Sequence, residues 1–339
     1  MLAIDLIDYI LATIPTKTIG LLGDLFLDRY LDIDPALDEP SVETGLTAYQ
    51  VTRVRSYPGA LGTVVNNLAA LGVGRIYPIA VIGDDGEGYE LRQALRRMEA
   101  VELGGLVVAP DRRTPTYTKP MRGGQELNRL DIKNRTPTPA ALEDAVLELL
   151  DEAWPQLDAL LVLDQVSEED CGVVTKQVRE RLAKLGEEWP DTFVLADSRE
   201  RIGLFRNVCV KPNMQEAAKW FAKLMSELGR YDASEYIASK LNIIVFCTLG
   251  EHGIDVARPG QCLRNIPAYP VSGPIDIVGA GDSCTAGIAC AMVSGATHEQ
   301  AAAFGNLVAS ITIQQIGTTG TASPEQVRRR WKEVGGTRV

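Results

Sequence analysis

Short apolar segments alternate with longer amphipathic ones from Thr18 onward, and this alternation restricts the chain to a few folds. The apolar segments, each rich in Val, Ile or Leu, are Ile19–Leu22, Ile76–Ile82, Leu160–Leu163, Phe193–Ala196, Val208–Val210 and Ile243–Thr248. Continuous apolar strands are typical of a parallel sheet that is covered on both faces. Because strands that alternate with helices form βαβ units, the pattern predicts an α/β fold with a central, mostly parallel sheet and helices on both faces.

The segments between these strands have the length and periodicity of helices. We predict helices over Thr63–Leu71, Gly88–Glu99, Pro139–Leu150, Glu168–Leu185, Met214–Leu228, Ala280–Val293 and His298–Gln314. The stretch Met1–Ile14 is interpreted as a further amphipathic helix and not as a signal peptide. Its apolar residues are interrupted by Asp5 and Asp8, and no basic region leads it.

Two stretches interrupt the alternation and predict a small accessory β-sheet. Residues 29–57 hold short β-like pieces around an acidic loop, and residues 114–133 alternate like two strands joined near Gly123–Gly124. Such a sheet beside the main domain is a natural candidate for a lid. Since no interdomain linker is evident, residues 1–339 are predicted to form a single domain that includes this lid.

Charge and composition argue against several classes of function. The 339 residues carry a formal net charge of −11, whereas a nucleic-acid surface needs a concentrated positive field. No segment reaches the ~18 uninterrupted apolar residues of a membrane-spanning helix. We therefore expect a cytoplasmic protein without a nucleic-acid or membrane partner. The 2 histidines lie too far apart for a histidine-based metal site, and the 6 cysteines form no CxxC pair.

The segment Asp276–Gly287, with the sequence DIVGAGDSCTAG, is the most informative about chemistry. A Gly279-Ala280-Gly281 turn that opens a helix of small residues can point several backbone N–H groups at one spot, where the helix dipole favours negative charge. Asp282 beside this anion hole could accept the proton of a hydroxyl that attacks phosphorus. The alternative interpretation is that the glycines only permit a tight turn and that Asp282 only caps the helix.

Two other catalytic motifs do not fit the sequence. Ser283 lacks the second glycine of a GxSxG nucleophile motif, which argues against a serine hydrolase. The chain also has no GxxxxGK[ST] segment, so it is not a P-loop enzyme.

Five segments, in the expected order, resemble motifs of the ribokinase/PfkB family of carbohydrate kinases. Asp276–Asp282 is similar to the DTxGAGD motif of that family. The other four are Gly23–Tyr30 (GDLFLDRY), the glycine motif and following helix Tyr57–Gly72, the NxxE-like segment Lys211–Glu216, and the TLGxxG segment Thr248–Gly253. The resemblance covers about residues 18–325 and implies a ribokinase-like fold.

The resemblance implies an ATP-dependent kinase and a role for each matching residue on its catalytic and nucleotide sides. Asp282 would be the general base, and Gly279, Ala280 and Gly281 the anion hole. Asn213 and Glu216 would organise Mg²⁺ and phosphate through water, since hard cations prefer oxygen ligands; the alternative is a helix cap followed by a surface glutamate. The expected nucleotide-site residues are Thr248, Gly250, Gly253 and, near the adenine, Asn306.

On the acceptor side, the resemblance implies that Asp28, Gly59 and Thr63 contact a sugar. If the substrate already carries a phosphate, Lys119, Arg122 and Arg129 of the accessory sheet could bind it. Solvated charges that protect an edge strand from aggregation are an equally good interpretation of these cations. The accessory sheet, through residues 42–56, could also form a homodimer, which is frequent in the family.

Within the family, the chain most resembles the heptose-phosphate kinase domain of the ADP-heptose pathway. This likeness rests on Gly23–Tyr30, on Arg129-Leu-Asp131, and on Gly317-Thr318 followed by Ser323-Pro324. The expected reaction is transfer of the γ-phosphoryl group of ATP to a hydroxyl of a sugar or sugar phosphate. The alternatives are a kinase for a nucleoside, a ketose or a keto-deoxy sugar acid, and a catalytically silent ligand-binding homologue.

Several positions depart from the family pattern, mostly on the sugar side. Thr63 stands where the family has an Asn that binds sugar hydroxyls. Because Thr offers one hydroxyl in place of two donors and an acceptor, the hydroxyl pattern that is read should differ. The other departures are Ala60 for a second glycine, Asp164-Gln165-Val166 for an SDY-like motif, Ser198 for a proline and Val278 for a threonine.

Overall fold

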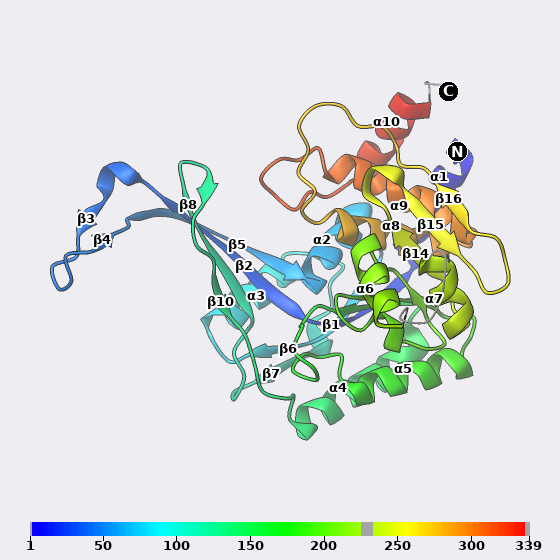
Figure 1. Cartoon of the computed structure of the whole chain (residues 1–339), viewed down its shortest axis with the longest axis horizontal. Helices are drawn as coiled ribbons and strands as arrows, with labels where there is room; N and C mark the ends of the chain where they lie inside the picture. The colour runs from blue at the N-terminus through cyan, green and yellow to red at the C-terminus, as the bar shows by residue number, and fades with distance from the viewer. Residues whose placement is uncertain (1, 225–232, 336–339) are drawn as a thin grey trace.

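Nine strands form the central sheet of the computed structural model, which describes residues 2–224 and 233–335 (Figure 1). From one edge to the other they are β16 (Arg264–Ile266), β15 (Ile254–Ala257), β14 (Val245–Thr248), β13 (Cys209–Val210), β12 (Phe193–Ser198), β11 (Ala159–Asp164), β1 (Thr18–Gly23), β6 (Arg75–Gly83) and β7 (Leu106–Ala109). The seven strands from β14 to β7 pair in parallel, and β15 and β16 add an antiparallel edge. The predicted α/β class and mostly parallel sheet are confirmed.

Helices cover both faces of this sheet, and each face has its own apolar core. One core is closed by α1 (Ile4–Thr13), α2 (Leu61–Leu71), α3 (Gly86–Arg96), α8 (Ala280–Val293), α9 (His298–Thr312) and α10 (Pro324–Gly335). The other is closed by α4 (Ala140–Ala153), α5 (Lys176–Glu188), α6 (Met214–Leu224) and α7 (Ala233–Leu241). In β11, Leu161 and Leu163 enter the first core, whereas Leu160 and Val162 enter the second. Because successive strand residues point to opposite faces, a strand between two cores must be apolar throughout.

A second sheet projects from the main body as the lid (Figure 1). Its strands follow the order β10 (Leu130–Ile132), β8 (Thr116–Arg122), β2 (Leu25–Ile33) and β5 (Val51–Ala60), with β9 (Gln125–Glu126) beside β8 and the small pair β3 (Glu39–Pro40) and β4 (Thr47–Ala48) at the tip. The turn at Gly123–Gly124 has φ values of 57° and 83°, which favour glycine. The accessory sheet is confirmed, but it begins at Leu25 and not at residue 29, because only Asp24 separates β1 from β2.

Other predicted boundaries differ from those observed. Helix α5 begins at Lys176 and not at Glu168, because the Thr175 side chain accepts the Val178 N–H at 3.3 Å and so caps the helix there. Residues 225–228 of the predicted Met214–Leu228 helix lie outside the described residues. Within the described ranges, no helix combines the length and apolar character needed to cross a membrane.

Candidate active site

The turn before helix α8 carries the proposed anion hole. Gly279 has a φ of 78°, and a Cβ added to it would lie 3.3 Å from the Thr319 side chain and 3.5 Å from that of Thr63. Thr63, in the first turn of α2, therefore lies against this turn. In the described part of the chain, the amides of Gly281 and Asp282 have no hydrogen-bond partner, as expected for the first turn of a helix. They are free to bind an anion.

Asp282 lies partly buried in this first turn. Burial, reinforced by the negative charge of Asp197, raises the pKa of Asp282 to about 7. Lys211 and Arg199 oppose this rise in pKa, and Asp28 adds to it. Carboxyl groups of the lid, the sheet and α8 therefore act on one another, and a base with a pKa near neutrality is suited to take a proton from a hydroxyl.

A buried ion pair lies beneath the turn. The Lys211 Nζ is 2.7 Å from the Asp197 Oδ2, and only 3% of the Lys211 side chain is exposed. Burial alone would lower the pKa of Lys211, but Asp197 and the other negative groups around it together raise this pKa above its ordinary value. A Cβ on Gly281 would lie 3.7 Å from this ammonium group. The role of Lys211 was not predicted from the sequence, although a lysine directly after the apolar strand end Val208–Val210 is itself a sign of a buried ion pair.

Asn213 and Glu216 form a reciprocal cap at the start of α6. The Asn213 N–H donates to the Glu216 carboxylate at 2.8 Å, and the Glu216 N–H donates to the Asn213 side-chain oxygen at 2.9 Å. Burial, then the charge of Asp197, raises the pKa of Glu216. The helix cap is thus observed, and the Glu216 carboxylate also lies within electrostatic reach of Asp197, Lys211 and Arg199. The described residues contain no group of three or more His, Cys, Asp or Glu side chains placed to hold a metal ion.

The predicted nucleotide-side residues meet around the end of β14. Thr248 donates its N–H to the Pro212 carbonyl at 2.9 Å and forms a β-bridge with Asn213. Gly250 and Gly253 have φ values of 61° and 89°, and a Cβ on Gly253 would lie 2.0 Å from the Ile266 carbonyl oxygen.

The buried Asn306 amide acts on that same segment. It donates to the carbonyls of Ile266 (3.0 Å) and Pro267 (3.1 Å), so Asn306 fixes the loop after β16. Its contact with adenine stays a prediction.

On the acceptor side, Asp28 of β2 lies over Gly59 of β5. A Cβ on Gly59 would lie 2.3 Å from the Asp28 Oδ2, so glycine is needed for this approach. Burial raises the pKa of Asp28, and the positive charges of Lys119, Arg129 and Arg199 oppose that rise. Three cations therefore act on the predicted sugar-binding carboxylate, and Arg199 was not anticipated from the sequence.

These cations differ in how they are held. Arg129 makes two bonds to Asp131, of 2.7 and 2.9 Å, whereas Lys119 approaches the Tyr30 hydroxyl at 3.4 Å and lies 5.0 Å from its ring centroid. Arg122 pairs with Asp38 at 2.8 Å. Lys119 and Tyr30 of the lid line one cleft with Asp276 and Val278, and with the 317–318 loop, so the lid faces the segment that leads into the Gly279–Gly281 turn.

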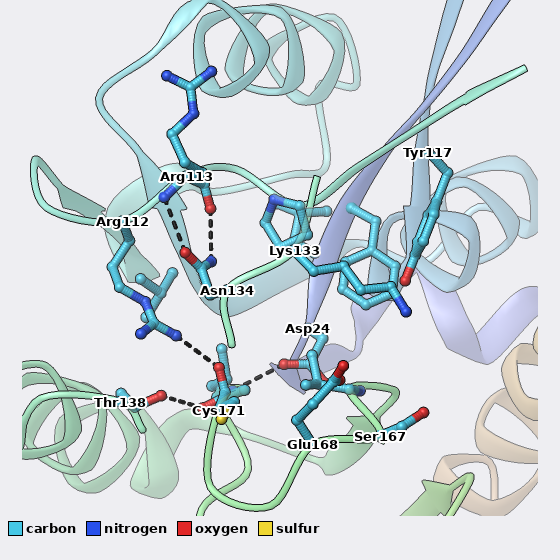
Figure 2. A pocket seen from close by; sticks show the side chains of 17 residues that line it. Asp24, Arg112, Arg113, Tyr117, Lys133, Asn134, Thr138, Ser167, Glu168 and Cys171 are labelled. Atoms are coloured by element: carbon cyan, nitrogen blue, oxygen red, sulfur yellow. Dashed lines mark hydrogen bonds between the residues drawn. The ribbon is translucent and has the colours of Figure 1, made fainter. Parts of the chain in front are cut away.

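A second pocket lies below the lid (Figure 2). It is lined by Tyr117 and Lys133 above, and by Asp24 and the loop after β11 below. The buried Asp24 carboxylate accepts hydrogen bonds from three amides of that loop, those of Gln165 (2.8 Å), Val166 (2.9 Å) and Val173 (2.8 Å). Burial, then the charge of Asp164, raises the pKa of Asp24 to about 6. Asp24 holds the loop in place, a role that was not predicted from the sequence.

Asp164 and Ser198, two residues that differ from the family pattern, form a hydrogen bond with each other. The Ser198 hydroxyl donates to Asp164 at 2.6 Å, and Arg201 donates to the same carboxylate at 2.5 and 3.0 Å. Gln165 connects this group to the active site, because its amide donates to Asp197 at 3.3 Å and accepts from the Arg199 Nε at 2.8 Å. Three of the altered residues, Asp164, Gln165 and Ser198, therefore take part in the polar contacts that lead to Asp197.

Comparison with known proteins places this geometry in a family. The model of the pfkB family carbohydrate kinases matches residues 27–326. The chain belongs to the PfkB family. This is a family of carbohydrate kinases, phosphotransferases with an alcohol group as acceptor.

Curated relatives of this PfkB-family chain include proteins named "Bifunctional protein HldE". The protein from Gluconobacter oxydans is 26% identical over 315 residues, which cover 92% of this chain and 64% of that protein. The protein from Citrifermentans bemidjiense is 29% identical over 308 residues, covering 90% and 61%. The chain thus spans less than two thirds of these relatives.

Solved structures confirm the ribokinase-like fold. Arabidopsis thaliana ribokinase, complexed with ribose and ATP, superposes with a TM-score of 0.69 at 20% identity and covers 93% of this chain and 98% of that chain. Escherichia coli phosphofructokinase-2, in complex with potassium, has a TM-score of 0.70 at 18% identity, with 94% and 99% covered.

Proposed function

We propose that Asp282 is the general base of this kinase and that the turn Gly279–Gly281 binds the phosphoryl group during transfer. The observation that carries this proposal is a carboxyl group with a pKa near 7 beside two backbone amides that have no partner in the described chain. Asp282 accepts the proton of the acceptor hydroxyl while the hydroxyl oxygen bonds to the γ-phosphorus and ADP leaves with the bridging oxygen. The amides of Gly281 and Asp282, with Lys211 beneath them, offset the negative charge.

We further propose that Asn213 and Glu216 orient water molecules around Mg²⁺. The second carboxylate oxygen of Glu216 remains available after the cap is made, and Mg²⁺ commonly keeps several waters. When bound, this ion supplies positive charge to the phosphate oxygens. On the nucleotide side, Thr248, Gly250, Gly253 and Asn306 would shape the site.

The acceptor that we propose is a sugar phosphate, with a heptose phosphate as the leading candidate. The positive charges of Lys119 and Arg129 act on Asp28, which suits a substrate that already carries a phosphate. The likeness to HldE proteins at 26–29% identity supports a heptose. Asp28 would bind sugar hydroxyls over Gly59, and Thr63 would contribute one further hydroxyl.

We also propose that the chain forms a single kinase domain and assembles as a homodimer through the lid. The family match crosses both the lid and the central sheet, which supports a single unit. At the tip, between β3 and β4, Val42 and Leu46 are 103% and 71% exposed, and exposed apolar side chains of this kind suit an interface.

An ATP-consumption screen tests the function. The wild-type protein, with Mg²⁺, is assayed against sugars, sugar phosphates, nucleosides and keto-deoxy sugar acids. We expect turnover with at least one sugar phosphate, and a loss of about 10²–10⁴-fold in Asp282→Asn. The exposed Asp111→Asn serves as a matched control and should keep full activity. Wild-type-like turnover in Asp282→Asn would refute the proposed base, and turnover of nucleosides alone would refute the acceptor.

A further inference from the structure

Arg199 occupies an unusual position at the carboxyl end of β12. Its backbone N–H donates to the Asp164 carbonyl at 3.2 Å, so the residue is fixed beside the end of β11. Its side chain is exposed, and only its Nε makes a bond, to the Gln165 side-chain oxygen at 2.8 Å. In the described structure, its two terminal nitrogens have no hydrogen-bond partner, and no carboxylate forms an ion pair with it.

Other arginines of the chain show what a structural role looks like. Arg201, two residues later, is buried and donates to Asp164 through two nitrogens. Arg129 and Arg55 each make a two-nitrogen bond to one carboxylate. Arg199 is instead held by a neutral amide, which orients the guanidinium without neutralising it.

The anchoring amide belongs to a chain of bonds that ends beneath the anion hole. Gln165 donates to Asp197 at 3.3 Å, and Asp197 pairs with Lys211 at 2.7 Å. Arg199 and Lys211 are therefore two ends of one network.

The charge of Arg199 reaches groups on both sides of the active site. It opposes the rise in the pKa of Asp28 on the lid, of Asp282 on α8 and of Glu216 on α6, and it lowers the pKa that burial raises at Tyr117. Because Coulomb interactions fall with distance, Arg199 lies within electrostatic reach of groups on the lid, on α6 and on α8.

We propose that Arg199 is a catalytic residue that binds the γ-phosphoryl group as it passes from the nucleotide to the acceptor. This inference rests on the proposed function. The new bond joins the acceptor oxygen to phosphorus, the bond to the bridging oxygen breaks, and the proton goes to Asp282. Arg199 donates hydrogen bonds to the phosphoryl oxygens and keeps its own protons, like an arginine finger supplied by the same chain.

The test compares binding of two nucleotides that differ in the γ-phosphate. Mg·AMPPNP and Mg·ADP are titrated into the wild-type protein, Arg199→Gln and Arg206→Gln by calorimetry. Arg206 is an exposed arginine seven residues further along and is the matched control. We expect Arg199→Gln to bind Mg·AMPPNP about tenfold more weakly, as for loss of one charge-assisted contact, and to bind Mg·ADP as the wild type does. Unchanged affinity for Mg·AMPPNP, or an equal loss for both nucleotides, would overturn the assignment.

Kinetics with a heptose phosphate and with the unphosphorylated heptose separate this role from binding of the acceptor's own phosphate. A residue on the transferring group lowers kcat for both acceptors, by roughly 10²–10³-fold. A residue on the acceptor's phosphate raises KM for the heptose phosphate alone, which would contradict the proposal. If the wild-type protein binds neither nucleotide, the proposed function itself fails. If the wild-type protein binds both nucleotides, Asp282→Asn is inactive and Arg199→Gln keeps the wild-type kcat, then only the role of Arg199 fails.

Discussion

Asp282 shows how a single residue can be suited to catalysis and costly to the folded state. Its pKa is raised because burial and Asp197 both disfavour the carboxylate, while Lys211 and Arg199 keep the rise moderate. A surface aspartate with a pKa near 4 would be too weak a base to help a hydroxyl attack at neutral pH. The same environment destabilises the charged form of Asp282 in the folded protein.

The pH dependence of the reaction should report this carboxyl group. We expect kcat/KM to fall as the pH drops below about 7, because Asp282 becomes protonated. Replacing Asp197 by Asn removes a charge that raises this pKa, so the acidic limb should move to lower pH. Profiles from pH 5 to 9 for wild type, Asp197→Asn and Asp111→Asn measure the effect. A limb that does not move in Asp197→Asn would contradict the assignment.

Stability should change in the opposite sense from activity. The folded state binds the Asp282 proton more tightly than the unfolded state, so the unfolding free energy falls as the pH rises from about 4 to 7. Asp282→Asn removes this penalty, and its Tm should exceed that of the wild type by about 2 °C or more at pH 8. The difference should shrink near pH 4.5. Thermal unfolding at pH 8 and at pH 4.5 measures these Tm values, with Asp111→Asn as the control. A Tm for Asp282→Asn below that of the wild type at pH 8 would contradict the account.

Among the elements, those with a strong sequence signal were predicted well. The apolar strands between two cores and the α8 helix, whose predicted bounds match Ala280–Val293, were clear from composition and spacing. Strand β16 was missed because Arg264 and Asn265 are exposed and only Ile266 turns inward. Helix α10 was missed because Val327 and Val334 are its only fully buried residues in the described structure.

The arrangement of the candidate site was predictable only within a single segment of the chain. The Gly279–Gly281 turn and Asp282 are local, so their arrangement follows from the order of residues. The positions of Arg199 and Lys211 depend on contacts between strands that are far apart in sequence. No local pattern shows that these cations converge on the same place.

The cap at the start of α6 permits a test of its two roles. In Glu216→Gln the side-chain oxygen can still accept the Asn213 N–H, so stability should stay within about 0.5 kcal/mol of the wild type. If Glu216 orients water on Mg²⁺, the Mg²⁺ concentration for half-maximal activity should rise roughly tenfold. Asn213→Ala, by contrast, should lose about 1 kcal/mol of unfolding free energy. Urea unfolding and Mg²⁺ titration measure both, and an unchanged Mg²⁺ requirement in Glu216→Gln would exclude the metal role.

At the scale of the whole molecule, the lid has two parts to consider: the strands that carry the predicted acceptor-side residues, and the tip through which we propose that the dimer forms. The tip of the lid, with β3 and β4, extends away from the main body (Figure 1). Asp28 and Lys119 belong to lid strands β2 and β8, and Val42 and Leu46, between β3 and β4, are exposed. A dimer formed at the tips would link the position of each lid to its partner.

Disrupting the tip should therefore change assembly. We expect Val42→Asp with Leu46→Asp to convert a dimer into a monomer in light scattering, because charges would enter an apolar contact. Leu204→Asp, on the main body and 53% exposed, should leave the dimer intact. A dimer that survives the double substitution would place the interface elsewhere.

The most direct test of the account is a single-turnover measurement of phosphoryl transfer at pH 8. Wild type and Asp282→Asn are mixed with substoichiometric Mg·ATP and a saturating sugar phosphate, and product is quantified after rapid quenching. The account predicts that nucleotide binds to both proteins but that transfer slows by about 10²–10⁴-fold in the variant. Equal rates of transfer would show that Asp282 does not take the proton.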